Sequence, residues 1–260
     1  MAVAYRTKSG INQIQNFFRN NRTKSNLLGN SNFFLDIDRL FLCVANGLEA
    51  ISILQEFGLC FSNTVIKSSS QNTSSQVCFF KNIYLEILWP ENIQQQIDTE
   101  INFSARANWQ YTKASPFGIG LRIKRPYLQS DNELIKQYFI RDLIIDEYLY
   151  YFRANQNNIL EPFIFILPDY LEYNQMLAQN ISSQNRYTSH PLGVKNVTDI
   201  TIQFQDGRRR CSKIIDVLNN DNNIFDIVRA SEPLLELTFD HGRQNKQLDA
   251  RPTLPLIIKY

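Results

Sequence analysis

Apolar and polar residues alternate between residues 34 and 90 in an order that predicts a strand, a helix and three strands. Residues 40–44 form a short, continuously apolar run of the kind found in buried strands. Asn46 then stands where a helix cap is expected, with Glu49 three residues later, and apolar side chains recur at helical spacing until Gly58. Further strands are expected at 59–67, 76–81 and 83–89.

A weaker copy of this order occurs near the C-terminus. A strand is expected at 199–204, a helix at 211–218, and strands at 224–230, 234–239 and 254–259. The segments YLEILW and LLELTF, one from each copy, place Glu86 and Glu236 between apolar neighbours. We interpret the two stretches as copies of one βαβββ module, at about 34–90 and 193–260.

Residues 91–192, between the two modules, follow a less regular pattern. The polar composition of 90–116 indicates surface. Gly118 and Gly120 alternate with apolar residues in a strand expected at 117–124, which indicates a close approach of another group to the backbone. A helix is expected over 131–153, and the tyrosines at 148, 150 and 151 leave its end open between helix and strand. A strand is expected at 163–170 and a polar linker at 171–194.

Residues 1–32 differ in charge from the rest of the chain. They contain no acidic residue, and their basic residues are Arg6, Lys8, Arg19, Arg22 and Lys24. Apolar residues within this stretch are spaced as in a short amphipathic helix. Two interpretations follow: an N-terminal extension of a domain at 33–260, or an arm that docks onto an acidic partner.

Composition narrows the class of protein. A chain of 260 residues with 43% hydrophobic content can bury one large core or two small ones. The net charge of +2 creates no field that would favour nucleic acid or an anionic membrane. No signal peptide is evident, no run approaches the ~20 apolar residues of a membrane span, and the four cysteines form no CxxC pair. We expect a cytoplasmic protein that binds neither nucleic acid nor membrane, and a homodimer is left open.

Three stretches resemble the uncharacterised glyoxalase-like domain proteins of the vicinal oxygen chelate (VOC) superfamily: DRLFLCV, FFKNIYLEILWPE, and the closing LLELTFDHGRQ…RPTLPLIIKY. The resemblance covers roughly residues 34–90 and 193–260. It implies an α+β fold in which two βαβββ modules form curved mixed sheets and a half-open barrel with a concave pocket. In metal-dependent members of the superfamily, the ligands come from the first and last strands of each module.

Carried over to this chain, the resemblance places Arg39, Glu86, Asp199 and Glu236 in the four ligand positions. The two glutamates fit the pattern, and Asp199 has a carboxylate that can ligate. Arg39 stands where a histidine would be expected, and a guanidinium cannot ligate a metal. The resemblance therefore implies a site without the usual metal, so no cofactor is expected. If a divalent metal is bound, Glu86, Asp199 and Glu236 are its implied ligands.

Strand alternation places Glu86 on the same face as Tyr84. A single carboxylate on an apolar face is costly unless it is paired or solvated, so we expect Arg39 and Glu86 to face each other. That pair is either a structural salt bridge or part of a pocket that receives a small, anionic ligand. In the second case the residues contacting the ligand are Arg39, Glu86, Tyr84 and, across a cleft, Glu236.

Three classes of function remain open from the sequence, and the fold does not decide among them. The first is a small-molecule-binding or catalytic protein of the VOC type without its metal. The second is a lyase or dioxygenase that depends on a divalent metal. The third is a non-enzymatic interaction protein that uses the basic residues 1–32. His190 and His241, the only histidines, are both expected at the surface, which leaves little material for a catalytic triad.

Overall fold

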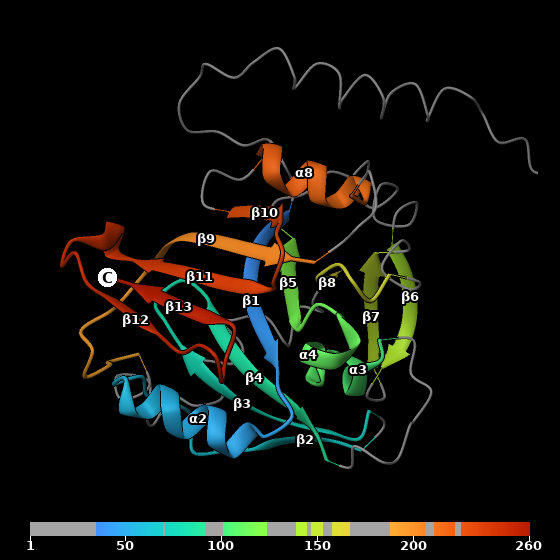
Figure 1. Cartoon of the computed structure of the whole chain (residues 1–260). Coiled ribbons are helices and arrows are strands. Elements are labelled where there is room, and N and C mark those ends of the chain that lie inside the picture. The colour runs from blue at the N-terminus through green and yellow to red at the C-terminus, as the bar shows by residue number, and fades with distance from the viewer. Residues whose placement is uncertain are drawn as a thin grey trace, which may run out of the picture. The chain divides into compact units, whose positions relative to one another are not determined.

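The chain forms two curved mixed β-sheets with few helices among its described residues, which is an α+β architecture (Figure 1). The computed structural model describes residues 35–69, 71–91, 101–123, 139–144, 147–152, 158–166, 188–205, 211–221 and 225–260. All of them belong to one compact unit, Phe33–Tyr260. Residues 1–32 lie outside the described residues. None of the described helices is long and apolar enough to cross a membrane.

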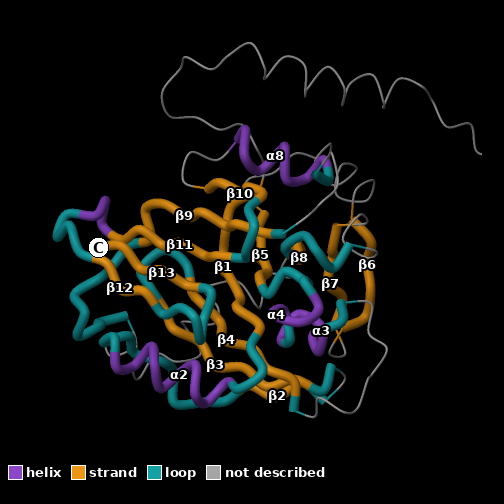
Figure 2. The backbone as a smooth tube through the Cα atoms, in the orientation of Figure 1, coloured by secondary structure: helices purple, strands orange, loops and turns teal. Residues whose placement is uncertain are grey.

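The larger sheet has eight described strands, in the order β2-β3-β4-β1-β5-β8-β7-β6 (Figures 1 and 2). The strands are β1 (Leu35–Cys43), β2 (Ile66–Ser68), β3 (Thr73–Phe79), β4 (Tyr84–Pro90), β5 (Phe117–Ile123), β6 (Phe139–Ile144), β7 (Glu147–Phe152) and β8 (Phe163–Ile166). Helix α2 (Gly47–Glu56) follows β1, and the short helices α3 (Phe103–Ala107) and α4 (Trp109–Thr112) precede β5.

This sheet consists of two halves with the same strand order. In the first half, β1 pairs with β4 in parallel, and β3 and then β2 follow antiparallel. In the second half, β5 pairs with β8 in parallel, and β7 and then β6 follow antiparallel. The halves join through β1 and β5, which are antiparallel. The strands that complete the first module's sheet therefore come from residues 117–166.

The sequence-based pairing of 34–90 with 193–260 is not the observed one. That pairing rested on the likeness of YLEILW to LLELTF, and short apolar strands resemble one another whichever strand they pair with. The helix expected over 131–153 is also wrong at 139–144, which form β6, and its end, left open between helix and strand, forms the strand β7. Tyrosine and isoleucine, which favour strands, are frequent in it. Residues 131–138 lie outside the described residues.

The C-terminal residues form a second sheet of five described strands, in the order β10-β9-β11-β13-β12 (Figure 2). Its elements are β9 (Val197–Phe204), α8 (Lys213–Asp221), β10 (Phe225–Arg229), β11 (Leu234–Phe239), β12 (Gln247–Asp249) and β13 (Leu256–Lys259). The strand predicted at 234–239 is confirmed at both ends. The other predicted strands of this region match to within two residues, and β12 was not predicted.

Helix α2 begins and ends where the sequence predicts. The Asn46 side chain accepts a hydrogen bond from the Glu49 backbone N–H at 3.2 Å and donates one to the Glu49 carboxylate at 3.2 Å. The first bond satisfies one backbone donor that the first turn leaves unpaired, and the second joins the two side chains. Gly58 follows the helix with a φ of +87°, a conformation that residues with a Cβ rarely adopt.

One face of the larger sheet carries an apolar cluster covered by α3. The cluster consists of Phe41, Cys43, Leu88, Ile101, Phe103, Ala107, Phe163 and Phe165. The close approach predicted in β5 is confirmed at Gly118, where a Cβ would lie 1.9 Å from a ring carbon of Phe41. The prediction that 90–116 is surface is wrong for α3, because Phe103 and Ala107 are buried. Few apolar residues surround this short helix in the sequence, so it gave no periodic signal.

His190 connects the segment before β9 to the first sheet, which corrects its prediction as a surface residue. The side chain is buried, with a relative exposure of 6%. Its Nδ1 accepts a hydrogen bond from the Cys60 N–H at 3.0 Å, so Nε2 carries the proton that it donates to the Phe79 carbonyl at 2.9 Å. Burial lowers the pKa of His190, although the bond to Phe79 acts to raise it.

We expect His190 to make stability fall in mild acid. The folded-state pKa lies below the unfolded value of about 6.5, so the folded form prefers the neutral ring. This contribution is fully present above the unfolded pKa and is lost as the pH falls from there through the lower folded-state pKa. In that range the unfolded chain binds a proton that the folded ring excludes, because Nδ1 is the acceptor for Cys60. Urea unfolding of wild type and His190→Gln at pH 7.5 and 5.5 measures the difference.

The matched control is His241→Gln, because His241 is exposed in the turn after β11. It should keep the full acid sensitivity of the wild type, whereas His190→Gln should lose part of it. Equal pH dependence in wild type and His190→Gln would contradict the prediction. At pH 7.5 the His190→Gln variant should lose about 1–3 kcal/mol, the cost of buried hydrogen bonds left unmade.

Candidate functional site

Arg39 and Glu86 face each other at the centre of the larger sheet, as the sequence predicts. Arg39 lies on β1 and Glu86 on the neighbouring parallel strand β4. The Arg39 Nη1 lies 3.0 Å from a Glu86 carboxylate oxygen and donates a hydrogen bond to the Tyr84 hydroxyl at 3.0 Å. The side chains of Arg39 and Glu86 are 15% and 9% exposed, so the ion pair is largely removed from solvent. The strand tolerates the buried Glu86 because its carboxylate is paired with Arg39, and because strand alternation places it on the same face as Tyr84.

The charges of this cluster support one another. Burial acts to lower the pKa of Arg39, but Tyr84 and Glu86 outweigh it, and the net shift is upward. Burial also raises the pKa of Tyr84, against the lowering effect of Arg39. At neutral pH the site therefore holds a charged guanidinium and a neutral phenol.

A second arginine extends the cluster along β1 and β5. Arg122 lies 3.1 Å from a carboxylate oxygen of Asp36 and 3.3 Å from one of Asp38. Sequence reasoning missed all three residues as members of the site. The alternation D-I-D-R within a buried strand was an available signal, because charges there require partners. Recognising Arg122 as the partner requires knowing that β5 pairs with β1.

One buried donor of the Arg39 guanidinium, Nε, is not used within the described part of the chain. Nη1 contacts both Glu86 and the Tyr84 hydroxyl, and the buried Nε has no hydrogen-bond partner. The guanidinium carbon lies 5.0 Å from the centre of the Phe165 ring and 5.6 Å from that of Tyr84. The Nε and Nη2 donors point along one flat edge, the geometry that matches a carboxylate. The two ring faces favour the cation that lies near them.

The residues do not fit the metal that the VOC resemblance implies. Arg39 occupies one ligand position and cannot coordinate. Its Nη1 binds Glu86, the carboxylate that would be the ligand from β4. Among the described residues, no three histidine, cysteine, aspartate or glutamate side chains gather as metal ligands do.

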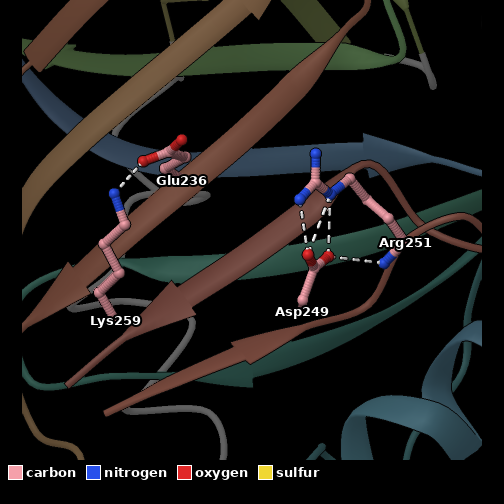
Figure 3. A network of polar contacts seen from close by, with 4 residues as sticks. All are labelled: Glu236, Asp249, Arg251 and Lys259. Carbon is pink, nitrogen blue, oxygen red and sulfur yellow. Dashed lines mark hydrogen bonds and ion pairs between the residues drawn. The ribbon is translucent and has the colours of Figure 1, made fainter. Parts of the chain in front are cut away.

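Glu236 does not join this cluster, which corrects the prediction that it lies opposite Arg39 and Glu86. It is on β11 in the second sheet, where its carboxylate binds Lys259 from β13 (Figure 3). Asp199 lies exposed on β9 of the same sheet, and partial desolvation, followed by the neighbouring Asp226, raises its pKa. The prediction failed because it took β11 as the counterpart of β4. In the observed larger sheet β8 has that place, and β11 belongs to the second sheet. A set of Glu86, Asp199 and Glu236 would therefore draw its ligands from both sheets.

Comparison with known proteins adds the fold alone. No family model matches the sequence, and no curated protein matches it. Among solved structures, the chain is similar to the crystal structure of a hypothetical protein from Staphylococcus aureus. The TM-score is 0.53 at 13% identity, and the match covers 87% of this chain and 98% of that one. The two proteins share a mixed α+β arrangement, and a shared fold does not establish a shared function.

Proposed function

We propose that this protein binds a small carboxylate at Arg39, in a metal-free site of the VOC type. The observation that carries the proposal is the unpartnered Nε of a buried, charged guanidinium that lies close to two aromatic rings. A buried donor without a partner costs about 1–3 kcal/mol, so a ligand that accepts from it gains that amount on binding.

The strand order supports a VOC-type site. Within each half of the larger sheet, the first strand lies beside the fourth, which is followed by the third and the second. The two halves meet through their first strands, β1 and β5. Two βαβββ modules placed edge to edge give this order. Arg39 and Glu86 then stand on the first and last strands of one module, where the superfamily builds its sites. Residues 124–138, which would hold the helix of the second module, lie outside the described residues.

The charges of the cluster limit the ligand. Two arginines, Arg39 and Arg122, face three carboxylates, Asp36, Asp38 and Glu86. A dianion would add to a small excess of negative charge, so a monocarboxylate is favoured over a dicarboxylate or a phosphate. The Phe165 and Tyr84 rings favour a ligand with a flat or apolar body.

Thermal melts with benzoate and its neutral analogue benzamide test the proposal. We expect benzoate to raise the melting temperature of the wild type and benzamide to have a smaller effect. A ligand at 100 times its dissociation constant stabilises by about 2.7 kcal/mol. Arg39→Met should abolish the shift caused by benzoate. Glu86→Gln should increase it, because Nη1 then loses its charged partner.

Arg251→Met is the matched control for loss of a cation. Arg251 is exposed and pairs with Asp249 on the second sheet, 2.6 Å away (Figure 3). This variant should keep the wild-type response to benzoate. The proposal is wrong if benzoate stabilises Arg39→Met as much as the wild type, or if benzamide replaces benzoate without loss. Elemental analysis of the protein purified without chelator adds a separate check, since one bound divalent metal per chain would favour the metal-dependent alternative.

A further inference from the structure

Buried polar atoms without partners gather beside the start of α8. The described part of the chain contains six buried side-chain nitrogen or oxygen atoms that lack a hydrogen-bond partner, and four of them belong to three residues there. They are Glu161 Oε2, Ser212 Oγ, and Arg229 Nε and Nη2. Buried polar groups are nearly always bonded, so a concentration of exceptions requires an explanation.

Contacts between distant segments bring these residues together. Ser212 immediately precedes α8, and its backbone N–H donates a hydrogen bond to Glu161 Oε1 at 2.9 Å. Glu161 is 1% exposed, so its second oxygen lies buried next to the first turn of the helix. Arg229 ends β10, against which α8 packs. Its guanidinium lies beside the Cys211 thiol. Burial raises the pKa of this thiol, and Arg229 acts to lower it.

Arg229 and Glu161 do not satisfy each other. No ion pair joins the two described side chains, although the charges of both shift the pKa of Cys211. Among the described residues, Glu161 Oε2 and Arg229 Nε have no hydrogen-bond partner. The Nε and Nη2 atoms of Arg229 form a flat donor edge that fits a carboxylate, and the Ser212 hydroxyl supplies another donor. Glu161 Oε2 instead needs a donor. The group that completes this arrangement therefore has a carboxylate at one end and a hydrogen-bond donor close to it.

We propose that Arg229, Ser212 and Glu161 form a second binding site, for a small acid whose carboxylate lies beside a hydroxyl or ammonium group. The carboxylate binds the Arg229 edge and the Ser212 hydroxyl, and the adjacent donor binds Glu161 Oε2. Arg229 and Glu161 cancel in charge, and the N-terminus of α8 favours an anion. Ser212 and Arg229 are partly exposed as whole residues, whereas Glu161 is buried. The site is independent of the one at Arg39.

Protection of Cys211 from a thiol reagent reports on the site. Cys43 and Cys78 are buried, and Cys60 and Cys211 are partly exposed. A Cys60→Ser background therefore leaves Cys211 as the accessible thiol among the four. The rate of its reaction with an aromatic disulfide is measured alone and with glycolate, glycine, acetate or methylamine as the probe.

We expect glycolate or glycine to slow the reaction, and the comparison of these two identifies the donor as hydroxyl or ammonium. Acetate, which lacks the donor, should need about tenfold more to give the same protection, as one unmade buried hydrogen bond implies. Methylamine, which lacks the carboxylate, should not protect. Arg229→Gln in the same background should abolish protection by glycolate and glycine.

The basal rate of each variant without probe corrects for any change in the exposure of Cys211. If Arg229→Gln does not fold, Ser212→Ala, which removes one hydroxyl, should still weaken protection several-fold. Three results would overturn the proposal: no protection by glycolate or glycine, equal protection by acetate, or unchanged protection in the variants. In the first case bound water alone satisfies these atoms.

Discussion

Arg106→Met is expected to lower the free energy of unfolding by about 3–5 kcal/mol, because it leaves several buried carbonyl groups without a donor. Arg106 lies in α3 and is fully buried. Its Nε donates to the Ile101 carbonyl at 3.1 Å, and its Nη1 donates to those of Ser115 at 2.7 Å and Glu161 at 3.0 Å. Urea unfolding followed by circular dichroism measures the loss.

The geometry explains why this one side chain matters. The carbonyls belong to segments that lead into α3, β5 and β8, and a single guanidinium joins all three. Burial lowers the pKa of Arg106 to about 10, which leaves it charged at neutral pH. A buried cation bound only to neutral acceptors depends on every one of them, since no carboxylate is paired with it in the described residues.

Two further variants serve as comparisons for Arg106→Met. Arg106→Lys keeps the charge and three donors but not the planar fork, and should lose less than Arg106→Met. Arg251→Met removes an exposed arginine and should change stability by less than about 0.5 kcal/mol. A loss below about 1 kcal/mol in Arg106→Met would contradict the prediction, because it would mean that water satisfies the carbonyls.

The local pattern of the sequence predicted most individual elements but not their neighbours. Alternation and capping located α2, β4, β5 and β11, because these signals depend on residues close in the chain. The partner of β1 depends on long-range pairing, which leaves no local trace. The sequence therefore could not show that β5 and β8 complete the larger sheet, and Glu236 was assigned to a site that it does not join.

The polar residues of the site show the same division. Arg39 and Glu86 were predictable, because each is a charge inside an apolar strand and one strand alternation relates Glu86 to Tyr84. Arg122 was not, because its role follows from the pairing of β5 with β1. His190 and Arg106 were also missed, since polar residues in irregular segments are exposed more often than buried. In both, hydrogen bonds to distant backbone groups make burial tolerable.

Removing either partner of the Arg39–Glu86 pair is expected to cost about 3 kcal/mol. The figure is at the lower end of the range for buried pairs, because 15% of Arg39 and 9% of Glu86 remain exposed. The double variant Arg39→Ala with Glu86→Ala should lose clearly less than the sum of the single losses. Each single change leaves an unpaired buried charge, and the double change leaves none. Chemical unfolding of the four proteins gives a coupling energy, expected at about 2 kcal/mol.

The Arg251–Asp249 pair is the control cycle, since both side chains are well exposed and their coupling should not exceed about 1 kcal/mol. Strictly additive losses at Arg39 and Glu86 would show that the ion pair does not form. The cycle also separates the two roles of this cluster. If Glu86→Gln lowers stability and strengthens benzoate binding, Glu86 holds Arg39 in place while competing with the ligand for it. A large coupling energy without any response to carboxylates would instead assign Arg39 and Glu86 to the structure alone.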